Sequence, residues 1–247
     1  DLPPEFLLTH PLSSSRISDA FNAAENISEE GTKQDSLEFS LMKARLEIYY
    51  ENIPANALRL FESKYAENPS DANLYGLALA YKKNNNFNEG LASLDKLLEK
   101  YPKNLVLNTT KVEFLSYFNK FNDALDLANK FLEISPKNYP LSISKSQILL
   151  NMGQYFESEE IIRDQLLRKN DSPELWFMLS ETQKTSQNIV GYHQSRAEYF
   201  LLLGQDEKAL NQLEFALQLT QNNFQVSDRI MTKIIEIKKS LQNSRGL

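Results

Sequence analysis

The side chains with catalytic potential are few and scattered in this 247-residue chain. Its two histidines, His10 and His193, lie far apart, and neither begins an HExxH helix motif for zinc. The sequence has no cysteine, no GxSxG elbow, no glycine-rich phosphate loop and no DxDxDG calcium loop. Adjacent carboxylates occur at Glu159-Glu160 and Asp206-Glu207, where we expect solvated helix faces. We therefore expect no enzyme activity, no metal site and no cofactor within this chain.

Composition narrows the function class further. The formal net charge is −6, and no dense cluster of lysine and arginine is present, so binding to nucleic acid is not expected. No apolar run approaches the roughly 18–20 residues that span a bilayer, so no transmembrane segment is expected. The absence of cysteine suits either a reducing cytosol or a periplasm. With only 7 glycines and 9 prolines, the chain favours long helices over a turn-rich β-sheet protein.

A repeat organises these helices. Small residues recur at separations of 33 or 34 residues, at Ala57, Gly90, Ala124 and Ser158, and Ala209 follows one and a half periods later. A proline stands 12 residues after each of the first three. A period of 34 residues, read as two helices and a turn, is the tetratricopeptide spacing. At Gly90 we expect the two helices of a hairpin to approach closely, because only a small side chain fits there.

The hairpin turns give an independent indication of the same period. Five residues before each small residue stands a glycine or an asparagine, the two types that best tolerate the left-handed backbone at a helix end. These residues are Asn52, Asn85, Asn119, Gly153 and Gly204. We therefore expect a tight turn between two helices at each of these positions.

The predicted fold class is all-α: a tetratricopeptide-repeat superhelix, an α-solenoid of antiparallel helix hairpins. The half period before Ala209 predicts one additional, single helix that contains Trp176. The final helix is expected to cap the stack with a polar outer face. The expected elements are hairpins at about 38–69, 71–102, 105–136 and 139–170, an extra helix at 173–186, a hairpin at 188–220 and a capping helix at 224–243.

The concave wall of such a superhelix is the candidate binding site, because the first helix of each hairpin lines it. Aromatic residues and methionine at inward positions favour adaptable contact with another protein. The alternative is that half of these residues simply pack between hairpins. The lysine- and asparagine-rich clamp that binds chaperone carboxylates is absent. The predicted groove residues are Phe39, Met42, Leu46, Tyr49, Tyr50, Tyr75, Leu79, Lys82, Glu113, Tyr117, Ile143 and Leu150.

The segment before the repeats carries a resemblance to a known family. PPEFLLTHPLSSSRISDA, with its HPxxxxRI stretch, closely resembles the end of the protease domain in periplasmic zinc metallopeptidases that have a C-terminal tetratricopeptide domain. The β-barrel assembly-enhancing protease of Gram-negative bacteria is the type of this family. The similarity continues through a linker and the repeats to SRAEYFLLLGQDEKALNQLEFAL at Ser195–Leu217.

The resemblance implies that residues 1–27 are the C-terminal edge of a protease domain, 28–37 a linker and 38–247 the repeat domain. It implies a periplasmic location, zinc in the intact protease and a role for His10 near that metal. It implies as partners the outer-membrane β-barrel precursors, the barrel-assembly machinery and the missing protease domain in cis. The HExxH region is absent here. The alternative is a stand-alone tetratricopeptide adaptor unrelated to proteolysis.

Overall fold

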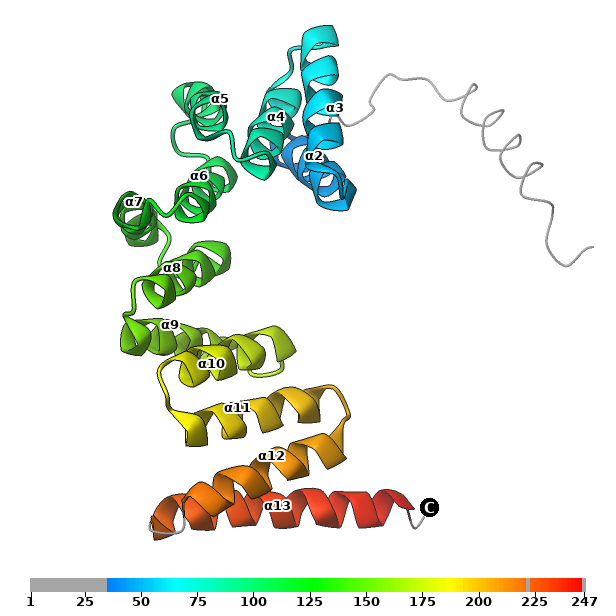
Figure 1. Ribbon diagram of the computed structural model, residues 1–247, viewed down its shortest axis with the longest axis vertical. Helices are drawn as coiled ribbons and strands as arrows, with labels where there is room; N and C mark the ends of the chain where they lie inside the picture. The colour runs from blue at the N-terminus through cyan, green and yellow to red at the C-terminus, as the bar shows by residue number, and fades with distance from the viewer. Residues whose placement is uncertain (1–34, 221–222, 246–247) are drawn as a thin grey trace, which may run out of the picture.

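The computed structural model describes residues 35–220 and 223–245, and these ranges contain twelve helices and no strand. The helices follow one another along an arc that is open on one side (Figure 1). They are α2 (Leu37–Tyr50), α3 (Pro54–Glu67), α4 (Asp71–Lys83), α5 (Phe87–Lys100), α6 (Leu105–Tyr117), α7 (Phe121–Ile134), α8 (Tyr139–Asn151), α9 (Tyr155–Arg168), α10 (Pro173–Thr185), α11 (Ile189–Leu202), α12 (Asp206–Leu219) and α13 (Phe224–Arg245). The prediction of an all-α tetratricopeptide solenoid is confirmed.

The predicted segments 1–27 and 28–37 lie almost wholly outside the described residues, and so does His10. No helix among the described residues is both long enough and apolar enough to cross a membrane.

Alternate helices begin at a serine or asparagine that recurs every 34 residues. In each case the side-chain oxygen accepts a hydrogen bond from the backbone N–H three residues further on, at 3.0–3.4 Å. This contact satisfies one of the free N–H groups in the first helical turn and fixes where the helix starts. The five residues are Ser36, Ser70, Asn104, Asn138 and Ser172, which precede α2, α4, α6, α8 and α10.

Left-handed residues close the turns that follow α4, α6, α8, α10 and α11. In each turn the next backbone N–H donates to the carbonyl five residues earlier, at 2.8–2.9 Å, which is a Schellman cap. Asn85, Asn119, Gly153 and Gly204 were expected there, with φ between +59° and +78°. The fifth residue, Gln187, has φ +62° and was not predicted to be left-handed.

Asn52 does not adopt the left-handed turn conformation that was predicted for it. Its φ is not positive, and the chain from α2 to α3 runs through Ile53 at φ −97° and ψ 110°. Ile53 precedes Pro54, and a residue before proline is held in extended conformation because the proline ring clashes with a helical one. Helices α2 and α3 pack mainly against α4 and not against each other, so the hairpin expected at about 38–69 does not form as a packed pair.

Helix α10 was predicted to stand alone, but it does not. It is paired with α11 through the turn at Gln187, and α11 is paired in turn with α12 through Gly204. The three helices α10, α11 and α12 are thus joined by two turns of the same left-handed kind. Helix α11 thus pairs both with α10 before it and with α12 after it. For this reason Ala209 follows Ser158 after one and a half periods of 34 residues and not after one or two.

The core is a series of four apolar clusters along the arc rather than one central core, as a solenoid requires. At Gly90 the hairpin partner α4 does lie close, because an added Cβ atom would be 3.2 Å from the Cβ atom of Tyr81, but a nearer neighbour comes from α6 in the next hairpin. A Cβ atom placed on Gly90 would lie 2.6 Å from the buried ring of Phe114.

The terminal helix α13 buries Ile230, Ile234 and Ile237 beside α12. Its outer face was expected to be polar, but it also exposes Met231 and Ile235. The prediction of a polar outer face is therefore only partly correct.

Candidate protein-binding surface

Helix α2 presents an apolar stripe to solvent. Phe39, Met42, Leu46 and Tyr49 follow one another at intervals of three, four and three residues, so they share one helix face. Their exposed fractions lie between 37% and 72%. The adjacent Tyr50 is exposed as well, and its ring contacts that of Tyr49 edge-on at 5.2 Å. We call the first four residues the α2 stripe.

Arg45 lies beside the α2 stripe and connects three helices. Its Nε donates to the Tyr75 hydroxyl of α4 at 2.9 Å, and its Nη2 donates to Thr110 and Glu113 of α6 at 2.8 and 3.0 Å. Burial by itself lowers the pKa of Arg45, but Tyr75 and Glu113 together raise it. The guanidinium is therefore a fixed cation that holds α2 across α4 and α6.

Two hollows flank this ion pair, and both include Arg45 and Glu113 in their walls. The first has a volume of about 220 Å³ and the second about 300 Å³. The first is lined by Met42, Arg45, Leu105, Val106, Thr109, Glu113, Asn138 and Pro140. The second is lined by Arg45, Ile48, Tyr49, Leu79, Lys82, Lys83, Glu113 and Tyr117. Together with the α2 stripe they form what we call the α2–α6 surface.

Two neighbouring lysines in the second hollow have different environments. The Lys83 ammonium donates to the carbonyls of Ile48 and Glu51, so it neutralises the C-terminal end of α2. The Lys82 ammonium has no hydrogen bond or ion pair within residues 35–220 and 223–245. It lies 5.2 Å from the centre of the Tyr117 ring. Burial lowers the pKa of Lys82, and Arg45 lowers it further, although Glu113 opposes both.

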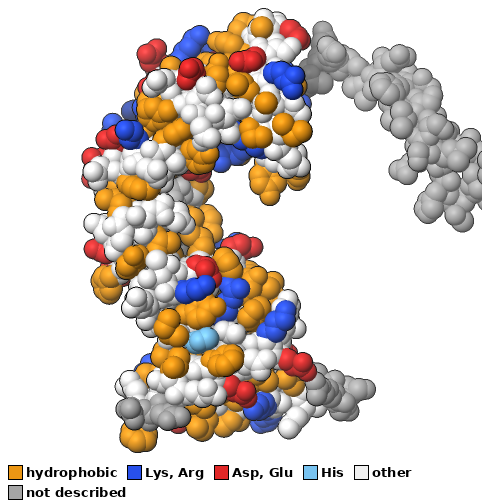
Figure 2. Space-filling model, viewed as in Figure 1, with side chains coloured by type: hydrophobic (Ala, Val, Ile, Leu, Met, Phe, Trp, Pro, Cys, Tyr) orange, Lys and Arg blue, Asp and Glu red, His pale blue; other side chains and the backbone are white. Residues whose placement is uncertain are grey.

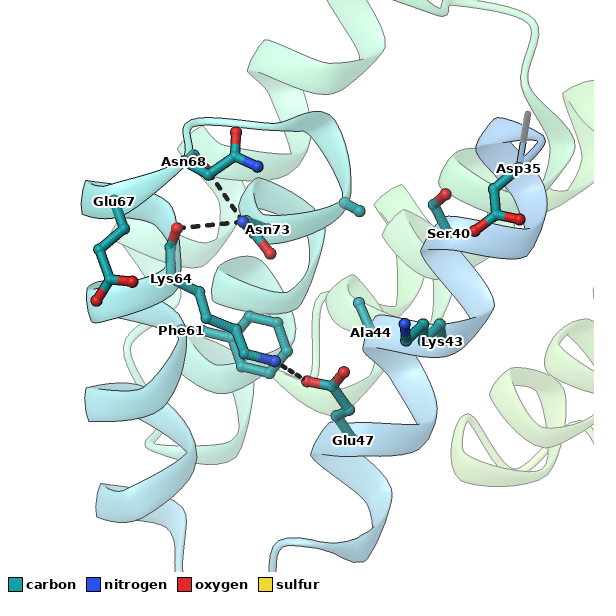
Figure 3. Close-up of a pocket in the computed structure, with 11 residues that line it drawn as sticks. Asp35, Ser40, Lys43, Ala44, Glu47, Phe61, Lys64, Glu67, Asn68 and Asn73 are labelled. Atoms are coloured by element: carbon teal, nitrogen blue, oxygen red, sulfur yellow. Dashed lines mark hydrogen bonds and ion pairs between the residues drawn. The ribbon is translucent and has the colours of Figure 1, made fainter. Parts of the chain in front are cut away.

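A further hollow in this part of the fold is lined largely by polar side chains that bond to one another. This third hollow, of about 360 Å³, lies between α2 and α3 (Figure 3). There Lys64 and Glu47 form an ion pair across the gap, and the Asn73 amide donates to the carbonyls of Lys64 and Asn68. Most polar groups of this hollow thus bond to one another, whereas Lys43, which also lines it, has no such partner among the described residues. The hollow has no exposed apolar stripe beside it comparable to the α2 stripe, so it is a weaker candidate for a ligand than the α2–α6 surface.

The predicted groove residues divide into three groups. Met42, Tyr49, Leu79, Lys82, Glu113 and Tyr117 line the two hollows. Phe39, Leu46 and Tyr50 are exposed on α2 outside the hollows. Ile143 packs beside the cluster around Leu175, and Leu150 is half-buried on α8, so the structure does not bring these two to the surface around Arg45.

Tyr75 was predicted to line the groove, and this prediction is wrong. Its side chain is 0% exposed and packs in the core, so it cannot contact a partner directly. Burial raises its pKa, so the hydroxyl stays protonated and can accept from Arg45 while it bonds to Thr110 at 2.9 Å. Tyr75 therefore positions Arg45.

Sequence reasoning missed Arg45, Leu105, Val106 and Pro140. The available signal for Arg45 was a basic residue between two apolar stripes of one helix. Its partners on α4 and α6 could not be read from the sequence, because Tyr75 is 30 residues away and Glu113 is 68.

The candidate catalytic groups have structural partners. His193 hydrogen-bonds to Gln212 at 2.8 Å and contacts the Phe215 ring. Glu159, expected to be solvated, is instead bonded to Arg163 and Gln183. No group of three or more potential metal ligands occurs among the described residues. The His193 and Glu159 side chains thus have contacts within the described part of the fold and do not lie on the α2–α6 surface.

Comparisons with known proteins agree with the fold. No family model and no curated protein matches the sequence. Among solved structures the chain is similar to PilW, described as a widely conserved type IV pilus biogenesis factor, with a TM-score of 0.56 and 17% identity. The similarity covers 81% of this chain and 100% of that one. This likeness shows the fold alone.

Two other solved structures are similar at lower TM-scores. A tetratricopeptide repeat protein from Parabacteroides merdae has a TM-score of 0.49 and 14% identity, and the match covers 89% of this chain and 90% of that one. The Thermus thermophilus protein TTC0263 has 0.47 and 20%, with 81% and 100% covered. The helix pairs, caps and turns define this chain as a tetratricopeptide-repeat solenoid, a fold of the protein-interaction type.

Proposed function

We propose that this chain is a non-catalytic protein-binding domain that holds a segment of another polypeptide on the α2–α6 surface. The single observation that carries the proposal is the exposed α2 stripe, which borders two hollows separated by the fixed Arg45–Glu113 pair. Apolar and aromatic side chains supply contact area, and fixed charges supply orientation. Figure 2 shows hydrophobic side chains where the upper part of the arc faces the hollow of the molecule.

We further propose that the domain belongs to a periplasmic zinc metallopeptidase, in which it follows the catalytic domain. Support comes from the resemblance of residues 3–20 and 195–217 to that family. The proposed partners are outer-membrane β-barrel precursors and the barrel-assembly machinery, with the protease domain in cis. The zinc would be bound by the catalytic domain, and no described residue is assigned to it.

The second candidate is a stand-alone adaptor. It is favoured by the repeat fold itself, which binds a partner without any catalytic domain. The reading frame upstream of Asp1 separates the two candidates. An in-frame HExxH motif supports the protease, whereas a start codon shortly before Asp1 supports the adaptor.

The binding proposal is tested by site-specific photo-crosslinking in Gram-negative cells. A photoreactive residue replaces Tyr117, which lines the second hollow and is exposed. The control is the same residue at Leu167, which is 87% exposed on α9. We expect β-barrel precursors or assembly components to be captured from position 117 and not from position 167. Equal capture from both positions, or none from position 117, contradicts the proposal.

A further inference from the structure

Helix α2 is apolar on two faces, and the other described residues cover only one of them. Leu41, Ala44 and Ile48 are buried on the face that packs against α4. The α2 stripe occupies a second face and remains exposed. A helix at the surface of a protein normally has one apolar face, whereas a helix with apolar residues all round is an interior helix. Helix α2 therefore has the composition of a helix with neighbours on both sides.

The spacing of the α2 stripe suits a helical neighbour. Intervals of three, four and three residues are those of a coiled-coil seam, in which side chains from two helices interlock at a small crossing angle. From Phe39 to Tyr49 the stripe is roughly 15 Å long, given a rise of about 1.5 Å per residue. An opposing helix of about three turns would cover it.

Charges of both signs lie beside the α2 stripe. The three carboxylates of this region of α2 have partners: Glu38 accepts from Asn104, Glu47 pairs with Lys64, and Glu51 accepts from the Ile53 N–H. In contrast, Lys43 and Lys82 have no ion pair or hydrogen bond within residues 35–220 and 223–245. Only Glu47 is neutralised by a cation, because the donors to Glu38 and Glu51 are a neutral amide and a backbone N–H. Lys82, which lines the second hollow together with Tyr49, is the cation that a carboxylate of a partner can meet beside the stripe.

We propose that the segment held on the α2–α6 surface is an amphipathic helix of a partner protein, with leucine-like residues facing the α2 stripe and carboxylates on its flanks. This inference rests on the proposed function and specifies the class of partner. One flanking carboxylate lies against Lys82 and relieves the cost of burying its charge. A second copy of this chain fits less well, because pairing α2 with α2 sets these unpaired cations against each other.

The test uses the full chain and two synthetic three-heptad peptides. Both carry leucine at the a and d positions. One has glutamate and the other has lysine at the flanking e and g positions. Fluorescence anisotropy is expected to show the glutamate peptide binding at least about tenfold tighter than the lysine peptide, a difference of about 1.4 kcal/mol. Equal affinity for the two peptides, or no binding of either, overturns the inference.

Three variants locate the contact. Leu46→Glu places a charge in the exposed stripe and is expected to weaken the glutamate peptide at least about tenfold, whereas Leu167→Glu on α9 should change affinity less than about twofold. Lys82→Met is expected to remove most of the preference for the glutamate peptide. Unchanged binding by Leu46→Glu overturns the proposal. Circular dichroism checks that each variant is folded.

The result also separates this inference from the proposed function. Capture of a partner at position 117, combined with failure of both peptides to bind, leaves the protein-binding proposal in place and overturns the helical partner. Light scattering adds a further outcome. A dimer that Leu46→Glu dissociates would identify a second copy as the occupant and overturn the proposal.

Discussion

Arg45 and Glu113 form an ion pair of 3.0 Å that ties helix α2 to helix α6 across 68 residues of sequence. Neither side chain is free to adapt to a partner, because Tyr75 and Thr110 hold the guanidinium from the other side. The pair forms a rigid partition between two apolar hollows. The stability of the first part of the solenoid and the shape of its candidate binding surface therefore depend on the same contact.

Replacement of Arg45 by methionine is expected to destabilise the protein. The change removes three hydrogen bonds and leaves Glu113 half-buried without its cation, which costs about 2 kcal/mol. Urea denaturation measures the loss. The control is Arg59→Met, because within the described part of the chain Arg59 bonds only to Asn56 on the surface of its own helix, and a change below about 0.5 kcal/mol is expected there. Equal effects of the two variants would show that the partition contributes nothing.

Lys82→Met is expected to stabilise the protein at pH 7 while it weakens binding of an acidic partner. The folded-state pKa of Lys82 lies below its ordinary value of 10.5, chiefly because of burial, so the charged form is disfavoured by folding. The gain should be complete at pH 7, should shrink as the pH rises through the lowered folded-state pKa to 10.5, and should vanish above 10.5, where Lys82 is neutral in both states. Thermal denaturation at pH 7 and at pH 10.5 tests this, with about 2–4 °C expected per kcal/mol.

Lys83→Met is the matched control for that experiment and should have the opposite sign. Its ammonium donates to two carbonyls at the end of α2, so its loss is expected to lower stability by about 1 kcal/mol. If both lysine variants lower stability at pH 7, the unfavourable burial of Lys82 is refuted.

Gly90→Ala is expected to destabilise the protein, although alanine is the better helix former by about 1 kcal/mol. The added Cβ would lie 2.6 Å from the buried Phe114 ring, and such overpacking costs about 1–3 kcal/mol. Because the ring is the obstacle, Phe114→Leu should cost less in the Gly90→Ala background than in the wild type. Additive effects in a double-mutant cycle measured by urea denaturation would contradict this explanation.

Gln187→Gly is expected to stabilise the turn between α10 and α11. Gln187 is held at φ +62°, where a residue with a side chain is strained by roughly 1–2 kcal/mol. Glycine removes this strain but loses more backbone entropy on folding, so we expect a net gain in stability of about 0.5–1 kcal/mol. The control is Gln154→Gly, because Gln154 has φ −86° and should lose stability. A gain at both positions, measured by thermal denaturation, would indicate a cause other than backbone strain.

The local period is what the sequence revealed best. Gly90, Asn85 and Gly153 marked the turns and a close helix approach, because a left-handed backbone and a short interhelical distance each admit few residue types. A left-handed turn was also predicted at Asn52, but it does not form, because Pro54 fixes an extended backbone before α3. The left-handed turn at Gln187 was not predicted, because glutamine has no intrinsic preference for the left-handed region.

The candidate surface was predictable only in part. Met42 and Tyr49 could be placed on an inward helix face from their spacing, since residues three and four apart share a face. Whether such a residue is exposed depends on the helix that lies opposite. Tyr75 was also placed on an inward face, yet it follows Leu41 by one period of 34 residues, and both are completely buried in one core cluster.

The sequence by itself determined the helical hairpins, because caps, turns and apolar stripes act over a few residues and recur every 34. The tertiary structure decided that α2 lies across α4 and α6 and that Arg45 meets Tyr75 and Glu113. It also decided that Lys82 remains without an ionic partner among the described residues. Contacts between residues far apart in sequence depend on how successive hairpins stack, and no local pattern encodes that geometry.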